Sequence, residues 1–145
     1  ENVAGIAGFG AAAEAAQVAL SDMARLAGLR DRLEREIRQI APDVVIIGAQ
    51  APRLPNTACI AWPGMRAETL VIRLDLMGIA VSAGSACSSG KVKASHVLAA
   101  MGQPEWVKAG AIRVSIGPAT EWNELERCLS SLERQLARRS KASAA

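Results

Sequence analysis

The residues with the clearest chemical potential lie between positions 82 and 95, a stretch made mostly of Gly, Ala and Ser. It contains Cys87, and no large neighbouring side chain is available to bury that thiol. An exposed thiol near Lys91 and Lys93 has its thiolate favoured by positive charge, and the thiolate is the nucleophile. A second interpretation stays open, a surface loop with an incidental cysteine, because an exposed thiol is reactive without being functional.

The same stretch does not match a phosphate-binding loop. The Walker pattern requires a Gly, four residues, then Gly-Lys and a Ser or Thr. Counting back from Gly90 places Ser85 where the first glycine is needed, and Val92 stands where the hydroxyl is needed. Specific contacts to the nucleotide and its magnesium ion would therefore be missing, which argues against a nucleotide hydrolase.

Arg113 is a candidate binding residue because it lies in a short apolar run, 111–116, that is typical of a strand. A guanidinium there either points to solvent or binds a carboxylate, which Arg does with two hydrogen bonds. Strand alternation places Arg113 on the face opposite Ile112 and Val114, and both interpretations remain open. His96, the single histidine, has no carboxylate near it in sequence and is interpreted as a capping or packing residue.

The three cysteines and one histidine do not suggest a metal site or a disulfide scaffold, because their number is odd and no CxxC is present. Cys59 lies in an apolar strand-like run and Cys128 on an apolar helical stripe, which are positions typical of buried structural cysteines. We therefore expect no metal and a reducing, cytoplasmic setting.

Length and composition predict one globular domain. The chain has 145 residues, of which 50% are hydrophobic and 21% charged, with a mean hydropathy of +0.17. This excludes general disorder. No uninterrupted apolar run approaches the roughly 20 residues of a transmembrane helix, and the N-terminus does not resemble a signal peptide, so no membrane association is expected. Residue 1 is Glu1 rather than Met, and we expect the chain to be a piece of a longer protein.

The net charge of +3 does not indicate nucleic-acid binding. Four basic residues lie in the last twelve positions, and without them the chain carries 13 basic and 14 acidic side chains. With one Phe, three Trp and no Tyr, aromatic platforms for stacking bases are nearly absent.

Hydrophobic spacing and turn residues predict an α+β fold. Ser21 or Asp22 is expected to begin a second helix and Thr120 to cap the last one. The arrangement implied is a small mixed or antiparallel sheet of about four strands with helices packed on one side. Helices are predicted at 3–20, 23–41, 67–77, 96–101, 104–109 and 120–138, and strands at 44–47, 57–62, 79–82 and 111–116.

The residues from Gly78 to Gly90, followed by Ser-His-Val-Leu at 95–98 and Met-Gly at 101–102, closely resemble the active-cysteine loop of cysteine desulfurases of the NifS/IscS type. The run 112–117 resembles their substrate-arginine strand, and 54–57 resembles the segment that opens their small-domain sheet. Residues 1–6 resemble the stretch that follows their phosphate motif. The resemblance extends in order to about residue 136, and the cysteine loop is its specific part.

This resemblance implies the C-terminal small domain of a fold-type-I pyridoxal-phosphate enzyme of the class-V aminotransferase family. Such enzymes convert L-cysteine to L-alanine and leave the sulfur as a persulfide for iron–sulfur cluster assembly or related sulfur transfer. Cys87 matches the sulfur-accepting cysteine, and Arg113 matches the arginine that binds the substrate carboxylate. Implied partners are L-cysteine, a sulfur-acceptor or scaffold protein, and a second copy of the full-length protein.

The resemblance also implies what this chain lacks. The family's cofactor lysine and the residues around the pyridine ring would precede Glu1, so no cofactor-binding residue is assigned here and the chain alone is expected to be inactive. Residues 1–20 would connect to the missing large domain, 21–138 would form the small domain with the cysteine loop at 82–95, and 139–145 would be a frayed tail. An alternative is a non-catalytic persulfide carrier or interaction module that uses Cys87.

Overall fold

The computed structural model describes the backbone of residues 1–84 and 95–142, with side chains through residue 138. Cys87 lies outside the described residues. The elements in chain order are α1 (Val3–Ala19), a 3-10 turn η1 (Leu20–Asp22), α2 (Met23–Ile40), β1 (Val45–Ile46), β2 (Thr57–Ala61), α3 (Ala67–Asp75), β3 (Ser82–Ala83), α4 (His96–Ala100), α5 (Glu105–Gly110), β4 (Ile112–Ser115) and α6 (Trp122–Ala142).

The four strands form one antiparallel sheet in the order β1-β2-β4-β3. This confirms the predicted α+β class. The two central strands alternate as half-buried strands do, so that Ile60 and Ile112 point to one face while Cys59 and Arg113 point to the other.

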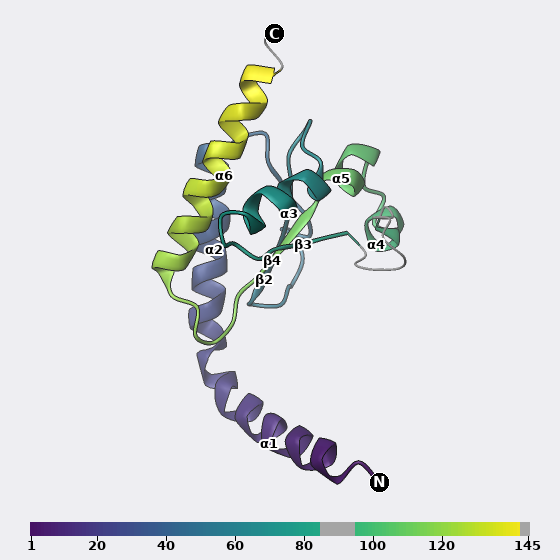
Figure 1. Cartoon of the computed structure of the whole chain (residues 1–145), viewed down its shortest axis with the longest axis vertical. Coiled ribbons are helices and arrows are strands. Elements are labelled where there is room, and N and C mark those ends of the chain that lie inside the picture. Colours follow the sequence, from purple (N-terminus) through teal and green to yellow (C-terminus); the bar gives the residue numbers. More distant parts are fainter. Residues whose placement is uncertain (85–94, 143–145) are drawn as a thin grey trace.

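Three helices, α2, α3 and α6, pack on the first face and enclose the main core (Figure 1). Their buried residues lie at helical spacing, which is why each helix has an apolar stripe. The centre of this core is made of fully buried side chains, among them Leu33, Ile60, Leu70, Leu74, Ile112 and Leu132.

Among the described residues, the second face of the sheet is covered at one end, by the short helices α4 and α5. Leu98 of α4 and Val107 of α5 pack on Ile47, Ala61 and Ala111 in a smaller apolar cluster. The remainder of this face carries the half-buried Cys59 and the exposed Arg113. The sheet therefore has one closed face and one partly open face.

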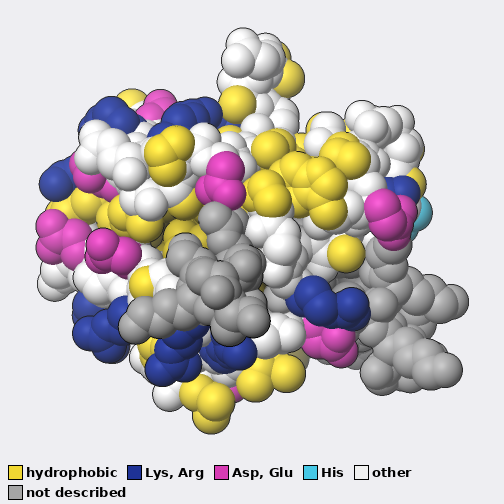
Figure 2. Space-filling view, turned by 90° about the horizontal axis from the view of Figure 1, so that it is seen from above, with side chains coloured by type: hydrophobic (Ala, Val, Ile, Leu, Met, Phe, Trp, Pro, Cys, Tyr) yellow, Lys and Arg dark blue, Asp and Glu magenta, His cyan; other side chains and the backbone are white. Residues whose placement is uncertain are grey.

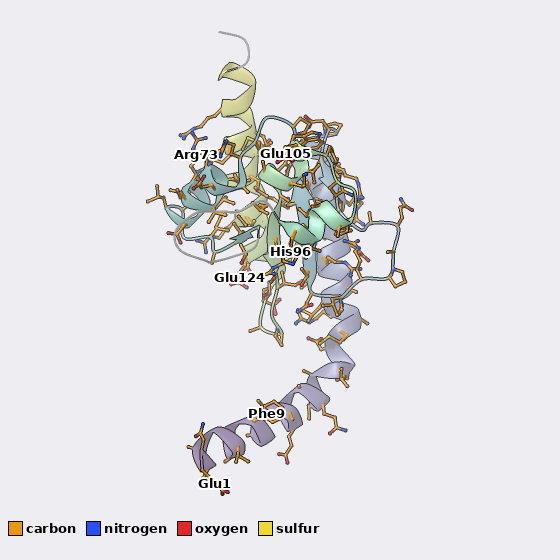
Figure 3. The ribbon with its side chains drawn as sticks, turned by 90° about the vertical axis from the view of Figure 1, so that its right-hand side faces the viewer. Glu1, Phe9, Arg73, His96, Glu105 and Glu124 are labelled. Atoms are coloured by element: carbon orange, nitrogen blue, oxygen red, sulfur yellow. The ribbon has the colours of Figure 1, made fainter. Side chains whose placement is uncertain are left out.

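Helix α1 projects from the body as an arm, with the N-terminus at its far end (Figure 1). None of its residues is buried, and Phe9 stands on it with 78% of its surface exposed (Figure 3). The helical run Val3–Ile40 contains an 18-residue window with a mean hydropathy of 1.4. By length and composition this run could cross a membrane, which the absence of a long uninterrupted apolar run in the sequence did not predict. A single such helix is weak evidence, because core helices pass the same test.

Two predicted helix caps differ from the structure. Asp22 does not cap α2, because η1 carries the helix through from α1 and the Asp22 carboxylate pairs with Arg25 at 2.8 Å instead. Thr120 does not cap α6, since its Oγ1 accepts a hydrogen bond from the Gly117 amide and closes the preceding turn. The Glu124 carboxylate accepts from the Glu121 amide, which is half of a capping box.

The third strand is shorter and later than the predicted run 79–82. Gly78 adopts a φ of 74° after α3, and the Ile79 amide donates to the Leu74 carbonyl in the manner of a Schellman cap. Ile79 therefore belongs to the end of the helix, and pairing with β4 begins only at Ser82.

Helix α6 also continues to Ala142, beyond the predicted end at Arg138. Its exposed face carries both signs of charge, because Arg127, Arg134 and Arg138 are exposed and so are Glu124, Glu126 and Glu133. Seen from above, basic and acidic side chains both occur on the side of the molecule where α6 lies (Figure 2).

Candidate functional site

Arg113 stands on β4 at the partly open face of the sheet. Its neighbours Ile112 and Val114 point into the main core, so strand alternation turns the Arg113 side chain outward, where it is exposed. The structure shows that the side chain is exposed, and its binding of a carboxylate stays a prediction. Within the described part of the chain, none of the ion pairs involves Arg113.

Arg113 has a residue directly beside it on each neighbouring strand. Its Cα partner on β2 is Cys59, and its Cα partner on β3 is Ser82. The three side chains lie in one row across the sheet because directly opposed residues point to the same face. We call Cys59, Arg113 and Ser82 the cross-strand row.

The backbone hydrogen bonds show which type of cross-strand pair Cys59 and Arg113 form. The Ile47 amide donates to the Cys59 carbonyl at 2.8 Å, so the backbone groups of Cys59 point to β1, away from β4. Between β2 and β4, the Ile116 amide donates to the Asn56 carbonyl at 2.9 Å, so residues 56 and 116 are a hydrogen-bonded pair. Hydrogen-bonded and non-hydrogen-bonded pairs alternate from there along the two strands. Cys59 and Arg113 are therefore a non-hydrogen-bonded pair, the type in which opposed Cα atoms are about 4.5 Å apart and side chains are closer.

The electrostatics of Cys59 agree with this proximity. Burial raises the pKa of the Cys59 thiol, and the positive charge of Arg113 opposes that rise. Burial alone raises the pKa of Cys128, which lies in the main core, to about 11. The thiol beside Arg113 is thus the more readily ionised of these two.

The rest of this part of the open face is polar and uncharged. Thr57 and Ser115 form the next opposed pair along β2 and β4, on the same face as the cross-strand row. No acidic side chain belongs to the four strands as described. An exposed guanidinium without a carboxylate neighbour in its own sheet is suited to bind a carboxylate from elsewhere.

His96 lies on α4 and does not belong to the cross-strand row. It is exposed at the start of α4, and the residue that caps the helix is Ser95, whose Oγ accepts a hydrogen bond from the Leu98 amide at 3.3 Å. The cap that the sequence suggested for His96 is therefore made by its neighbour.

The described residues do not make a site for pyridoxal phosphate or a metal. Lys108 is the one lysine whose side chain is described, and its Nζ pairs with the Glu105 carboxylate at 2.6 Å on the surface of α5. It is therefore not available as a buried Schiff-base lysine. No group of three or more potential metal ligands lies together among the described residues.

The site in the described structure differs from the sequence prediction in two respects. Cys87 falls outside the described residues, so its role stays a prediction. Cys59 was interpreted as a buried structural cysteine, whereas it is half-buried and opposed to Arg113. Alternation along 57–61 could have placed Cys59 on the face opposite Ile60, but its pairing with Arg113 depends on a register that the sequence does not state.

Comparison with known proteins identifies the family. The family model for aminotransferase class-V matches residues 1–128. The chain belongs to the aminotransferase class-V family. A cysteine desulfurase from Enterobacter agglomerans is 41% identical over 138 residues, which are 95% of this chain and 34% of that protein. The cysteine desulfurase IscS of Dictyoglomus turgidum is 40% identical and covers 92% of the chain and 34% of the relative.

A solved structure gives the same result. The NifS-like protein from Rickettsia africae superimposes with a TM-score of 0.81 at 32% identity, over 92% of this chain and 34% of that one. The class-V chain therefore spans about a third of the length of the relatives it matches, and it shares their fold over that third.

Proposed function

We propose that this class-V chain is the C-terminal part of a cysteine desulfurase, in which Cys87 accepts the sulfur atom and Arg113 binds the substrate carboxylate. The observation that carries the proposal is the exposed Arg113, unpaired within the described residues, on β4 beside the strand that leads toward Cys87. The names of the similar proteins supply the reaction class.

The carboxylate role of Arg113 follows from its surroundings. A guanidinium offers a planar set of N–H donors that matches the two oxygens of a carboxylate. Because Arg113 comes from a central strand, the sheet holds its backbone in place from both sides. An amino-acid substrate bound there would be oriented with its carboxylate on the open face.

The role of Cys87 depends on chain connectivity. Cys87 follows Ser82, the residue opposed to Arg113, by five residues, and five residues span at most about 18 Å, so the length of the chain is compatible with a Cys87 that acts beside Arg113. In the proposed reaction, L-cysteine and the Cys87 thiol give L-alanine and a Cys87 persulfide. This exchange balances without an oxidant, because one sulfur atom passes from carbon to sulfur.

The remaining machinery would come from the other two thirds of the full-length protein. Pyridoxal phosphate is the cofactor that class-V relatives imply, and the described residues do not fit it, so we assign its site to residues outside this chain. Helix α1, apolar and without a buried residue here, is suited to pack on that missing part. A homodimer and a sulfur-acceptor or scaffold protein complete the proposal.

The test uses the full-length protein with L-cysteine. Cys87→Ser should abolish persulfide and sulfide formation while L-cysteine still binds. The control is Cys128→Ala, which removes a thiol from the core and should keep persulfide formation, sulfide formation and L-cysteine binding. Unchanged sulfide release by Cys87→Ser would exclude the proposed role. Full-length protein that accepts sulfur but never turns over L-cysteine would instead identify a persulfide carrier.

A further inference from the structure

We propose that Cys59 is a positioning residue for Arg113: its side chain limits where the guanidinium lies on the open face and leaves that guanidinium free to bind a carboxylate. The inference rests on the proposed function, because it requires Arg113 to bind the carboxylate of L-cysteine. It adds a residue of β2 to a site otherwise assigned to β4.

The backbone brings the two side chains together. Cys59 and Arg113 are opposed in a non-hydrogen-bonded pair, which is the closest side-chain approach that an antiparallel sheet provides. The Cβ atoms of two residues opposed in this way are about 4.5–5.5 Å apart, so each side chain starts directly beside the stem of the other. Cys59 therefore restricts the arginine on the β2 side.

Cys59 is itself held in place from its other side. It packs against the small apolar cluster of the second face, which includes Leu98 of α4 and Ala61 of β2. A half-buried side chain supported in this way has little freedom to move aside. It links the rigid part of the face to the exposed guanidinium.

The chemistry of the side chain suits this role. Burial favours the neutral form of the Cys59 thiol, which is a weak acceptor and does not neutralise a guanidinium. An Asp in the same place would form an ion pair with Arg113 and compete with the substrate. A neutral, short side chain restricts Arg113 without occupying its donors.

The first experiment measures KM and kcat for L-cysteine in the full-length protein. Cys59→Ala should raise KM about threefold with little change in kcat, because loss of the sulfur atom lets the guanidinium move more freely. A threefold change in KM corresponds to about 0.7 kcal/mol. Cys59→Ser, of similar size, should restore KM. Cys59→Asp should raise KM about tenfold through the new ion pair.

The controls separate this inference from the proposed function. Ser130→Asp adds the same charge on the exposed face of α6 and should leave KM unchanged. Arg113→Ala should raise KM by itself, and in that background the Cys59 substitutions should have no further effect. If Arg113→Ala does not raise KM, the proposed carboxylate role fails. If Arg113→Ala raises KM but Cys59→Ala and Cys59→Asp leave KM unaltered, the positioning role is wrong. It is also wrong if the Cys59 substitutions change KM by the same factor in the Arg113→Ala background.

A second readout does not depend on activity. Alkylation of Cys59 in the full-length protein, followed by peptide mass spectrometry, should slow in Arg113→Met, which keeps much of the side-chain bulk but removes the cationic neighbour of the thiolate. Cys128 in the same sample is the internal control, and its rate should not change. An unchanged rate at Cys59 would show that the two side chains do not interact and would overturn the inference.

Discussion

The guanidinium of Arg53 donates two hydrogen bonds to the carboxylate of Glu34, with Nη1–Oε1 and Nη2–Oε2 distances of 2.6 and 2.9 Å. Glu34 is buried on α2, and Arg53 lies in the loop that leads into β2. Arg30, also on α2, donates to the Leu54 carbonyl at 2.6 Å. The entry to the strand that carries Cys59 is thus anchored to a core helix.

Removal of Arg53 should destabilise the fold, because it leaves a buried carboxylate without its partner. We expect Arg53→Ala to lower the free energy of unfolding by about 3 kcal/mol, measured by urea denaturation. Replacing both partners, as Arg53→Met with Glu34→Leu, should recover much of that loss. Arg35→Ala on the exposed side of the same helix is the control, and an equal effect of Arg35→Ala and Arg53→Ala would contradict the prediction.

Gly110 should not tolerate a side chain. A Cβ at this position would lie 2.5 Å from the Met65 carbonyl oxygen, a backbone atom that cannot move aside cheaply. Gly110→Ala is expected to lower the melting temperature, with a loss of about 2 kcal/mol or more from overpacking. Gly28→Ala is the matched control, because a Cβ at this exposed position of α2 meets no atom within 4 Å. This substitution should raise the free energy of unfolding by up to about 1 kcal/mol. Two changes of the same sign would refute this contrast.

Cys128 should be nearly inert at neutral pH. Burial raises its pKa to about 11, so at pH 8 its thiolate fraction is about a hundredfold below that of a thiol with an ordinary pKa near 9. Alkylation followed by mass spectrometry should show a rate that climbs with pH up to that value. Because the folded pKa is the higher one, this thiol stabilises the fold fully below pH 9.0, and the contribution is lost as pH rises toward about 11. Rapid labelling of Cys128 at pH 7 in folded protein would contradict the assignment.

Helix α1 should exchange its amide hydrogens much faster than α2 when this chain is studied alone. Its 17 residues bury nothing in the described structure, and an isolated helix of this length is marginal in water. Hydrogen–deuterium exchange with peptide resolution measures both helices in one sample. In the full-length protein we expect α1 to become protected, and equal protection in both proteins would argue against packing on the missing part.

The sequence allowed the fold class and most element centres to be predicted, because alternation along 57–61 and 112–115 and the stripe on α6 are strong patterns. The ends were less accurate. Ser21, Asp22 and Thr120 have capping residue types, but the continuous helix at η1 and the turn at Gly117 use them differently. Such outcomes depend on tertiary contacts, including the hydrogen bond from Arg25 to the Thr120 carbonyl at 3.0 Å.

The candidate site was predicted in part. The exposed face of Arg113 follows from the alternation of apolar residues on its strand. The opposition of Arg113 to Cys59 and Ser82 does not, because it joins segments more than thirty residues apart through a register that local patterns leave undetermined. That is why the sequence alone predicts a structural role for Cys59.

The two outer strands, β1 and β3, are each two residues long, whereas the inner strands are longer. Each outer edge therefore exposes very few unsatisfied backbone groups that a foreign strand could pair with. Intermolecular β-pairing, a common route to aggregation, has little backbone on which to begin in this domain. The N-terminal arm, where Ile6, Phe9 and Val18 are exposed, offers a larger apolar surface for self-association, so replacing surface residues on that helix is a rational way to improve solubility.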